Sequence, residues 1–170
     1  MSASSLVTER TARAVRSSGR RVFCLTGLVE AGVDRSRVYV TNAVKHFKCG
    51  PRGKPRLHKR PNANEIKICR RWLFGEIEAV SPRLIVALGA TAAQGLTGRA
   101  IREQSSRGAV LNAANGSRVF ITIHPSALLR LHDEEEKRAG YASFVSDLRA
   151  IGQLIETPTE EARSGVRAIE

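Results

Sequence analysis

Two polar side chains stand where apolar, strand-like runs end, and both have the chemistry of a binding or catalytic site. Asn42 ends the run RVYVTN (37–42), and its amide can donate and accept hydrogen bonds at once, as reading the edge of a base requires. His124 lies in VFITIHP (119–125), where an imidazole can polarise a carbonyl or stabilise developing negative charge. Each also has a structural interpretation, as a turn residue or a strand-end histidine.

The segment PSALLR, which follows His124, adds an apolar and a cationic component. We expect Ser126 to cap the next turn. Leu128 offers an apolar wedge and Arg130 a phosphate-seeking guanidinium, a combination that suits a protein that opens a base stack.

A basic loop, GKPRLHKRP (53–61), connects the first of these runs to an amphipathic helical pattern. Its cations include Lys54 and Arg56, and its imidazole is His58. Together with Lys45 before it, the loop predicts contacts with phosphates. An imidazole held close to an electrophilic sugar carbon can also act as a nucleophile, and the alternative is a solvated loop that only meets phosphates.

The overall charge agrees with an anionic partner. The formal net charge is +12 and the isoelectric point is near 10.8, which favours nucleic acid, although an arginine-rich proteome also produces basic proteins without that function. Apolar runs such as LIVAL are far shorter than a bilayer requires, and the first ten residues contain no apolar leader. We therefore expect a cytoplasmic protein without membrane contact. We also expect it to be a monomer.

The three cysteines, Cys24, Cys49 and Cys69, cannot all pair with one another, and a cytoplasmic chain keeps them reduced. Metal or cluster ligation therefore competes with plain buried thiols.

The elements that position these residues follow from hydrophobic periodicity. Runs at 37–42, 84–89 and 119–125 lack alternation and indicate strands buried on both faces of a parallel sheet. Helical patterns follow them: one capped by Asn62 and Glu65, one in ATAAQGLTG, and one after the acidic DEEE. This order predicts a three-layer α/β/α fold with a short, doubly wound parallel sheet, whose ligand crevice lies at the carboxyl ends of the strands.

Five segments together resemble the uracil-DNA glycosylase superfamily, in its iron-sulfur family 4 branch: VTNAVKHFK, the basic loop, ICRRWL, LIVALGATAA and HPSALLR. They are most similar to the X-type enzymes, which cross-link to uracil in DNA. The resemblance runs from about Leu28 to Ile155. It implies a DNA-repair hydrolase that acts on uracil in single-stranded or duplex DNA.

The resemblance also implies roles for single residues. Asn42 would read the base edge, His124 would stabilise the departing uracil anion, and His58 would capture the sugar C1′. The X-type loop has the form K-R-R-I-H, and residues 54–58 here read KPRLH. The residues expected to contact DNA or substrate are Asn42, Lys54, Arg56, Ser126, Leu128 and Arg130.

Family 4 proteins carry a 4Fe-4S cluster held by four ligands, two of them an early cysteine pair. His46 and Cys69 fall at two of the ligand positions, but the early C-x-x-C is absent. The sequence therefore predicts an incomplete ligand set.

The N-terminal segment departs most from the family, because the motifs GEQPGD and PFVGPAG and a first strand are missing. Reverse translation of Val15–Val22 with allowed codons, read in a shifted frame, gives Pro-Phe-Val-Gly-Pro-Ala-Gly. Met1–Thr8, with suitable codons, can likewise give Val-Gly-Glu-Gln-Pro-Gly-Asp. We interpret residues 1–27 as an out-of-frame translation, 28–155 as the glycosylase-like domain and 156–170 as a disordered tail. The alternative function is a catalytically impaired, basic DNA-binding remnant.

Overall fold

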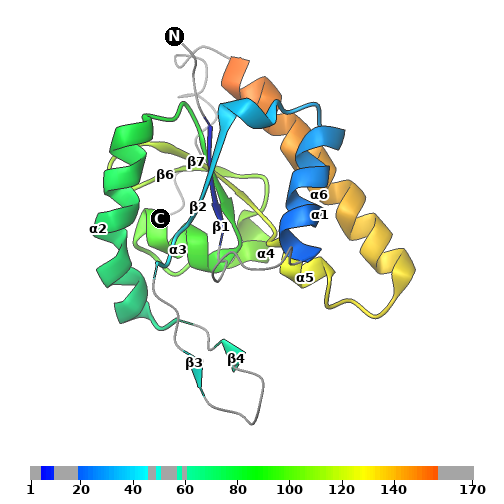
Figure 1. The fold of residues 1–170 in the computed structure, drawn as a ribbon, viewed down its shortest axis with the longest axis horizontal. Helices are drawn as coiled ribbons and strands as arrows, with labels where there is room; N and C mark the ends of the chain where they lie inside the picture. Colours follow the sequence, from blue (N-terminus) through cyan, green and yellow to red (C-terminus); the bar gives the residue numbers. More distant parts are fainter. Residues whose placement is uncertain (1–4, 10–18, 46–48, 51–56, 59–60, 157–170) are drawn as a thin grey trace.

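The structure is a computed structural model that describes residues 5–9, 19–45, 49–50, 57–58 and 61–156. In these residues a five-stranded sheet with the strand order β2-β1-β5-β7-β6 lies between two layers of helices (Figure 1). The strands are β1 (Ser5–Glu9), β2 (Val38–Asn42), β5 (Ile85–Leu88), β6 (Val110–Asn112) and β7 (Arg118–Thr122). Strands β2, β1, β5 and β7 are parallel, and β6 is an antiparallel edge strand.

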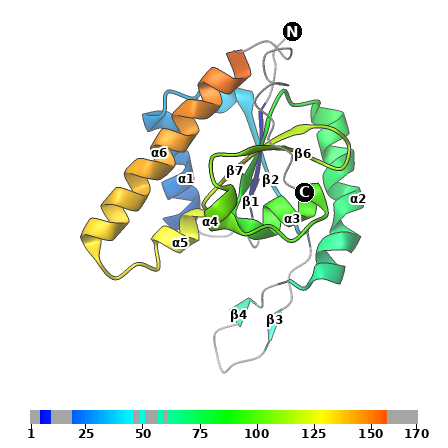
Figure 2. The ribbon, with the colours of Figure 1, turned by 180° about the vertical axis from the view of Figure 1, so that it is seen from behind.

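Helices cover both faces of the sheet, as Figures 1 and 2 show. One layer contains α2 (Ala63–Val80) and α3 (Ala90–Thr97). The other contains α1 (Gly19–Glu30), α5 (Pro125–Leu128) and α6 (Glu134–Glu156). The predicted three-layer α/β/α fold is confirmed. A short helix, α4 (Glu103–Ser106), precedes β6, and a small ribbon of β3 (Cys49–Gly50) and β4 (Leu57–His58) projects from the sheet.

Strand β5 explains why the apolar run at 84–89 shows no alternation. Ile85 and Ala87 pack into the core under α2 and α3, whereas Val86 and Leu88 pack into the core under α1 and α6. All four side chains are buried, so a central parallel strand needs an apolar residue at every position.

The two long helices form where their capping signals predict. The Asn62 side chain accepts from the Glu65 backbone N–H, and the Glu65 carboxylate accepts from the Asn62 N–H, both at 2.9 Å. This capping box starts α2. Helix α6 has acidic residues in its first turn and buries Phe144, Leu148 and Ile151.

A first strand is present, and the expectation that it would be missing is wrong. Strand β1 pairs with β2 on one side and with β5 on the other. The physical reason is that an empty slot between these two strands would leave two rows of backbone groups without partners, and Leu6, Val7 and Thr8 suit an extended backbone. Helix α1 begins at Gly19 and runs through the expected boundary at residue 27.

Strand β6 was not predicted, because three residues at an antiparallel edge give almost no periodic signal. The expected tail at 157–170 lies outside the described residues. Among the residues that are described, no helix combines the length and the apolar character needed to cross a bilayer.

Candidate active site

The strand register brings Asn42 and His124 to the same edge of the sheet. Asn42 is paired with Glu9, and Leu88 with Thr122, so the carboxyl ends of β2, β1, β5 and β7 lie side by side. His124 follows the end of β7 after one intervening residue, Ile123. Both polar residues therefore lie at the predicted crevice edge, separated by the ends of β1 and β5.

His124 has a defined orientation because it is the N-cap of α5. Its Nδ1 accepts a hydrogen bond of 3.0 Å from the Ser126 backbone N–H. A neutral imidazole that accepts at Nδ1 carries its proton at Nε2, which makes Nε2 a hydrogen-bond donor. The expectation that Ser126 would cap this turn is wrong. Pro125 occupies the first helical position, where no N–H is needed, so the next N–H is the one that the imidazole reaches.

Arg130 is anchored to the start of α5 through Ser126. Its Nε donates to the Ser126 carbonyl oxygen at 2.9 Å, and its Nη2 donates to Ser126 Oγ at 3.2 Å. The guanidinium is exposed to solvent, so it offers a fixed positive charge beside the edge that carries His124.

Of the two leucines in this segment, the structure buries Leu128 and exposes Leu129. Leu128 is 5% exposed and belongs to the core under α1 and α6, whereas Leu129 is 38% exposed. A Cβ built on Gly140 would lie 2.4 Å from Leu128 Cδ2, so the glycine makes room for the leucine. Leu128 would have to leave this core to enter a base stack.

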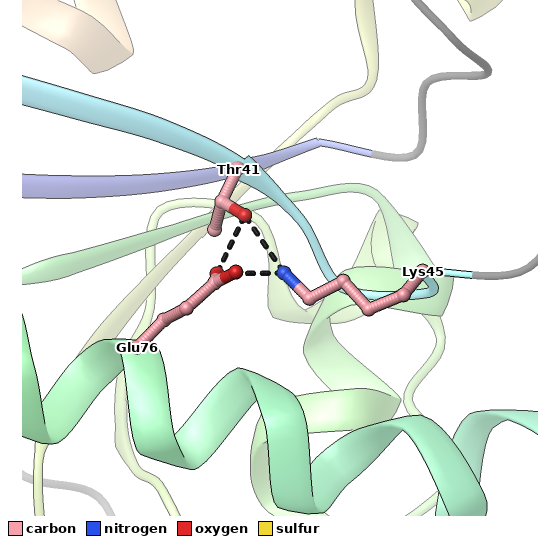
Figure 3. Close-up of polar contacts among 3 residues, drawn as sticks. All are labelled: Thr41, Lys45 and Glu76. Carbon is pink, nitrogen blue, oxygen red and sulfur yellow. Dashed lines mark hydrogen bonds and ion pairs between the residues drawn. The ribbon is translucent and has the colours of Figure 1, made fainter.

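The end of β2 is held by a three-residue polar network beside Asn42 (Figure 3). Lys45 Nζ donates to Glu76 Oε2 at 2.6 Å and to Thr41 Oγ1 at 2.8 Å, and Thr41 Oγ1 donates to Glu76 Oε2 at 2.6 Å. Glu76 lies on α2, so the network fixes the turn after Asn42 to that helix. Lys45, expected at a phosphate, is instead paired with a carboxylate.

The end of β7 is held in the same way from the opposite helix layer. Thr122 is fully buried and donates to Asp147 Oδ2 at 2.5 Å, and Arg107 Nε donates to the same oxygen at 2.8 Å. One carboxylate on α2 and one on α6 thus fix the two strand ends from which Asn42 and His124 project.

Glu76 and Asp147 were not predicted from the sequence, although their positions beside buried helix residues are visible in it. Glu76 directly precedes the buried Ile77, and Asp147 directly precedes the buried Leu148. An acidic residue beside the apolar stripe of a helix can indicate a partner facing it, since a partly buried carboxylate gains from hydrogen bonds.

Several predicted site residues cannot be located. His46, Lys54 and Arg56 lie outside the described residues. His58 is described in its backbone alone, where it pairs with Cys49 in the β3–β4 ribbon. Whether the loop cations and this imidazole reach the sheet edge therefore stays a prediction.

The described residues do not fit an iron-sulfur cluster. Cys69 is buried in an apolar cluster with Val44 and Ile66. Across the described part of the chain, no three His, Cys, Asp or Glu side chains gather in a way that could hold a metal ion. Four cluster ligands are required, so no chemical step is assigned to such a group.

Comparison with known proteins gives consistent matches. The family model of the uracil DNA glycosylase superfamily matches residues 10–149. A type-4 uracil-DNA glycosylase of Thermotoga maritima is 36% identical over 122 residues, which cover 71% of this chain and 60% of that protein. A type-5 uracil-DNA glycosylase of Pyrobaculum aerophilum is 43% identical over 103 residues, covering 57% of this chain and 40% of that protein. The chain thus spans about half the length of these two relatives.

Proposed function

The chain belongs to the uracil DNA glycosylase superfamily, and we propose that it recognises uracil in DNA, cleaves the N-glycosidic bond and captures the sugar through His58. The observation that carries the proposal is the placement of Asn42 and His124 on one edge of the sheet. The names of its type-4 and type-5 relatives support the same substrate.

Base recognition is assigned to Asn42. A base inside a duplex cannot be reached, so the uracil turns out of the stack and presents its edge to the protein. The amide of Asn42 donates to a carbonyl oxygen of uracil and accepts from its N3–H, and an amide held in this orientation does not match the amino group and N3 acceptor of cytosine. The network of Thr41, Lys45 and Glu76 supports this role, because it fixes the backbone directly after Asn42.

Bond cleavage is assigned to His124. When the bond between N1 of uracil and C1′ of the sugar breaks, its electron pair stays on uracil, and negative charge spreads onto the ring oxygens. A donor at Nε2 stabilises that charge, and the hydrogen bond from Ser126 to Nδ1 supports this tautomer. Removal of one such donor typically lowers the rate by about two orders of magnitude.

Covalent capture is assigned to His58. A ring nitrogen of its neutral imidazole donates an electron pair to the oxocarbenium-like C1′, which forms a carbon–nitrogen bond, and the imidazole then loses its N–H proton to solvent. The departing uracil anion takes a proton from solvent. Where the imidazole is absent, water attacks the same carbon and leaves an abasic site.

The remaining DNA contacts are assigned by charge and exposure. Lys54 and Arg56 would meet phosphates beside the loop, and Arg130 would meet a phosphate beside α5. We assign the apolar wedge to Leu129 instead of Leu128, because Leu129 is exposed and Leu128 is buried.

Residues 1–27 are proposed to be an out-of-frame translation of the family's N-terminal segment. The shifted readings of Met1–Thr8 and Val15–Val22 support this, since allowed codons can be chosen that give two family motifs in the correct order. The nucleotide sequence decides: codons at Val15–Val22 that do not read Pro-Phe-Val-Gly-Pro-Ala-Gly in the shifted frame would exclude the idea. If it holds, the chain as written lacks an acidic catalytic loop, which favours the impaired DNA-binding remnant as the second candidate.

The test uses the chain as written and the same chain with the frame restored. Each protein is incubated with single-stranded DNA that contains one uracil, and products are separated by denaturing electrophoresis. We expect the restored protein to form a complex that survives denaturation, because the sugar–imidazole bond is covalent. A chain as written that binds the DNA but forms no product would identify it as the remnant.

Three variants of the restored protein separate the assigned roles. His58→Ser is expected to abolish the complex and to release free uracil, whereas Asn42→Ala reduces both products. His132→Ser is the matched control, because His132 is an exposed histidine between α5 and α6. A covalent complex that persists in His58→Ser would show that His58 is not the nucleophile. DNA with thymine in place of uracil is the substrate control and should give no product.

A further inference from the structure

The outer face of α2 exposes an unusually apolar surface for a helix of such a basic protein. Ile68 is 59% exposed and Trp72 is 55% exposed. They line a shallow cleft of about 550 Å³ together with Asn64, Lys67 and Arg71. Since exposed large apolar side chains that cluster with polar neighbours can mark interaction sites, this cleft is a candidate binding site.

The charge around the cleft is positive. Lys67 and Arg71 are exposed and line it directly, and no acidic residue is among its lining residues. The acidic residues in the first four turns of α2 are engaged elsewhere, because Glu65 accepts from the Asn62 N–H and Glu76 pairs with Lys45. An anionic occupant is therefore favoured.

Trp72 supplies an aromatic surface next to one of these cations. The Arg71 guanidinium carbon lies 5.2 Å from the centre of the Trp72 ring, within cation–π range. Aromatic side chains on which bases stack, combined with cations that follow the backbone, are the arrangement by which proteins hold single-stranded nucleic acid.

The position of the cleft relates it to the candidate site. It lies on the N-terminal half of α2, which begins directly after the basic loop 53–61. In Figure 1 that end of α2 is at the same end of the molecule as the carboxyl ends of the strands and the β3–β4 ribbon. A DNA strand that enters the sheet edge can therefore continue along this face.

We propose that the outer face of α2, centred on Trp72, is a stacking platform for the single-stranded DNA that flanks the target base. The inference rests on the proposed function for its ligand class. Bases stack on Trp72 and contact Ile68, and Lys67 and Arg71 meet the adjacent phosphates. Contacts of this kind are independent of base identity, because every base has a stacking face.

Trp72 itself is the probe, since it is the only tryptophan of the chain. The full chain is titrated with an all-thymine single-stranded oligonucleotide, which contains no target base. We expect quenching of tryptophan emission that saturates and weakens with salt. Fluorescence anisotropy of an end-labelled oligonucleotide should show about tenfold weaker binding in Trp72→Ala. Lys67→Ala and Arg71→Ala should each reduce the log–log salt slope by about 0.7.

The matched control is Val29→Ala on α1, because Val29 is 71% exposed and lies in the opposite helix layer. This variant should bind as the wild type does. The proposal would be overturned if the tryptophan emission of the wild type is not quenched by DNA and Trp72→Ala binds DNA with wild-type affinity. It would also be overturned if the wild type self-associates with rising concentration and Trp72→Ala does not. Quenching is measured on DNA without uracil, and excision is measured separately on DNA that contains uracil. Quenching in the first experiment without excision in the second would contradict the proposed function alone. Excision in the second without quenching in the first would contradict the platform alone.

Discussion

The hydroxyl of Thr122 donates a hydrogen bond of 2.5 Å to Oδ2 of Asp147, and this contact attaches the end of β7 to α6. Thr122 is fully buried, and the residue that projects from the same strand end is His124. The position of the imidazole therefore depends in part on the Asp147 carboxylate, which holds the strand end through Thr122.

Asp147→Ala should destabilise the protein by about 2 kcal/mol, because the buried Thr122 hydroxyl and the Arg107 guanidinium both lose their acceptor. Asp147→Asn should cost less, since its amide oxygen still accepts from Thr122. Chemical denaturation measures both changes. Ser146→Ala, at the exposed neighbouring position, is the control and should leave stability unchanged. Equal stability of Asp147→Ala and wild type would exclude the role of this contact.

Glu76→Gln should weaken the attachment of the end of β2 to α2, because Lys45 and Thr41 both donate hydrogen bonds to the Glu76 carboxylate. We expect a loss of about 1 kcal/mol in unfolding free energy. Lys45→Met should leave the salt dependence of DNA binding unchanged, since that ammonium is already paired. A salt slope that falls in Lys45→Met would instead place this cation at a phosphate.

Leu128→Ala and Leu129→Ala should separate packing from DNA contact. Leu128 is buried against Gly140, so its truncation should cost about 3 kcal/mol in thermal or chemical unfolding. Leu129 is exposed, so Leu129→Ala should keep stability. It should lower product formation on duplex DNA more than on single-stranded DNA, because only a duplex has a stack to open. Equal effects on both substrates would argue against Leu129 as the wedge.

Tyr141 should remain protonated to unusually high pH. Burial, together with the 2.9 Å hydrogen bond from its hydroxyl to Glu30 Oε1, raises the pKa of Tyr141 from 10.0 to about 12. Because the folded pKa is above the unfolded one, the stabilisation is complete below about pH 10 and is lost as the pH rises through 12. The difference in tyrosinate absorbance between wild type and Tyr141→Phe measures the titration. A midpoint near 10 would exclude the contact.

The purified chain as written should be colourless and free of stoichiometric iron. Cys69 lies in an apolar cluster with Val44 and Ile66, and the early cysteine pair of the family is absent. Iron analysis and visible absorption test this. Stable absorption of a 4Fe-4S cluster with matching iron would show that Cys24 or Cys49 serves as a ligand.

Most of the fold was predictable from strong local signals. The apolar runs gave β2, β5 and β7 within about three residues at each end, and the Asn62 capping box gave the start of α2. Strand β1 was missed because its place is determined by the strands on either side of it. A central slot between two parallel strands accepts a short segment without a strong pattern of its own.

The polar residues of the candidate site could be predicted from the sequence. The packing of the side chains around them could not. Asn42 and His124 could be assigned to one edge, because carboxyl ends of parallel strands share an edge. The sequence prediction placed the wedge at Leu128, although two adjacent leucines look alike in a sequence, and the structure buries Leu128 and exposes Leu129. Gly140, on the following helix α6, leaves room for Leu128, since a Cβ at this position would lie 2.4 Å from Leu128 Cδ2.

The strand order also has a consequence for how the chain folds. Leu6 of β1 pairs with Tyr39 on one side and with Ile85 on the other, so the sheet closes only after a distant part of the chain has been synthesised. Pairing of this non-local kind slows folding. Until β5 arrives, β1 presents an open backbone edge to other chains in the same state. We therefore expect dilution or chaperones to favour formation of the native sheet over association of nascent chains.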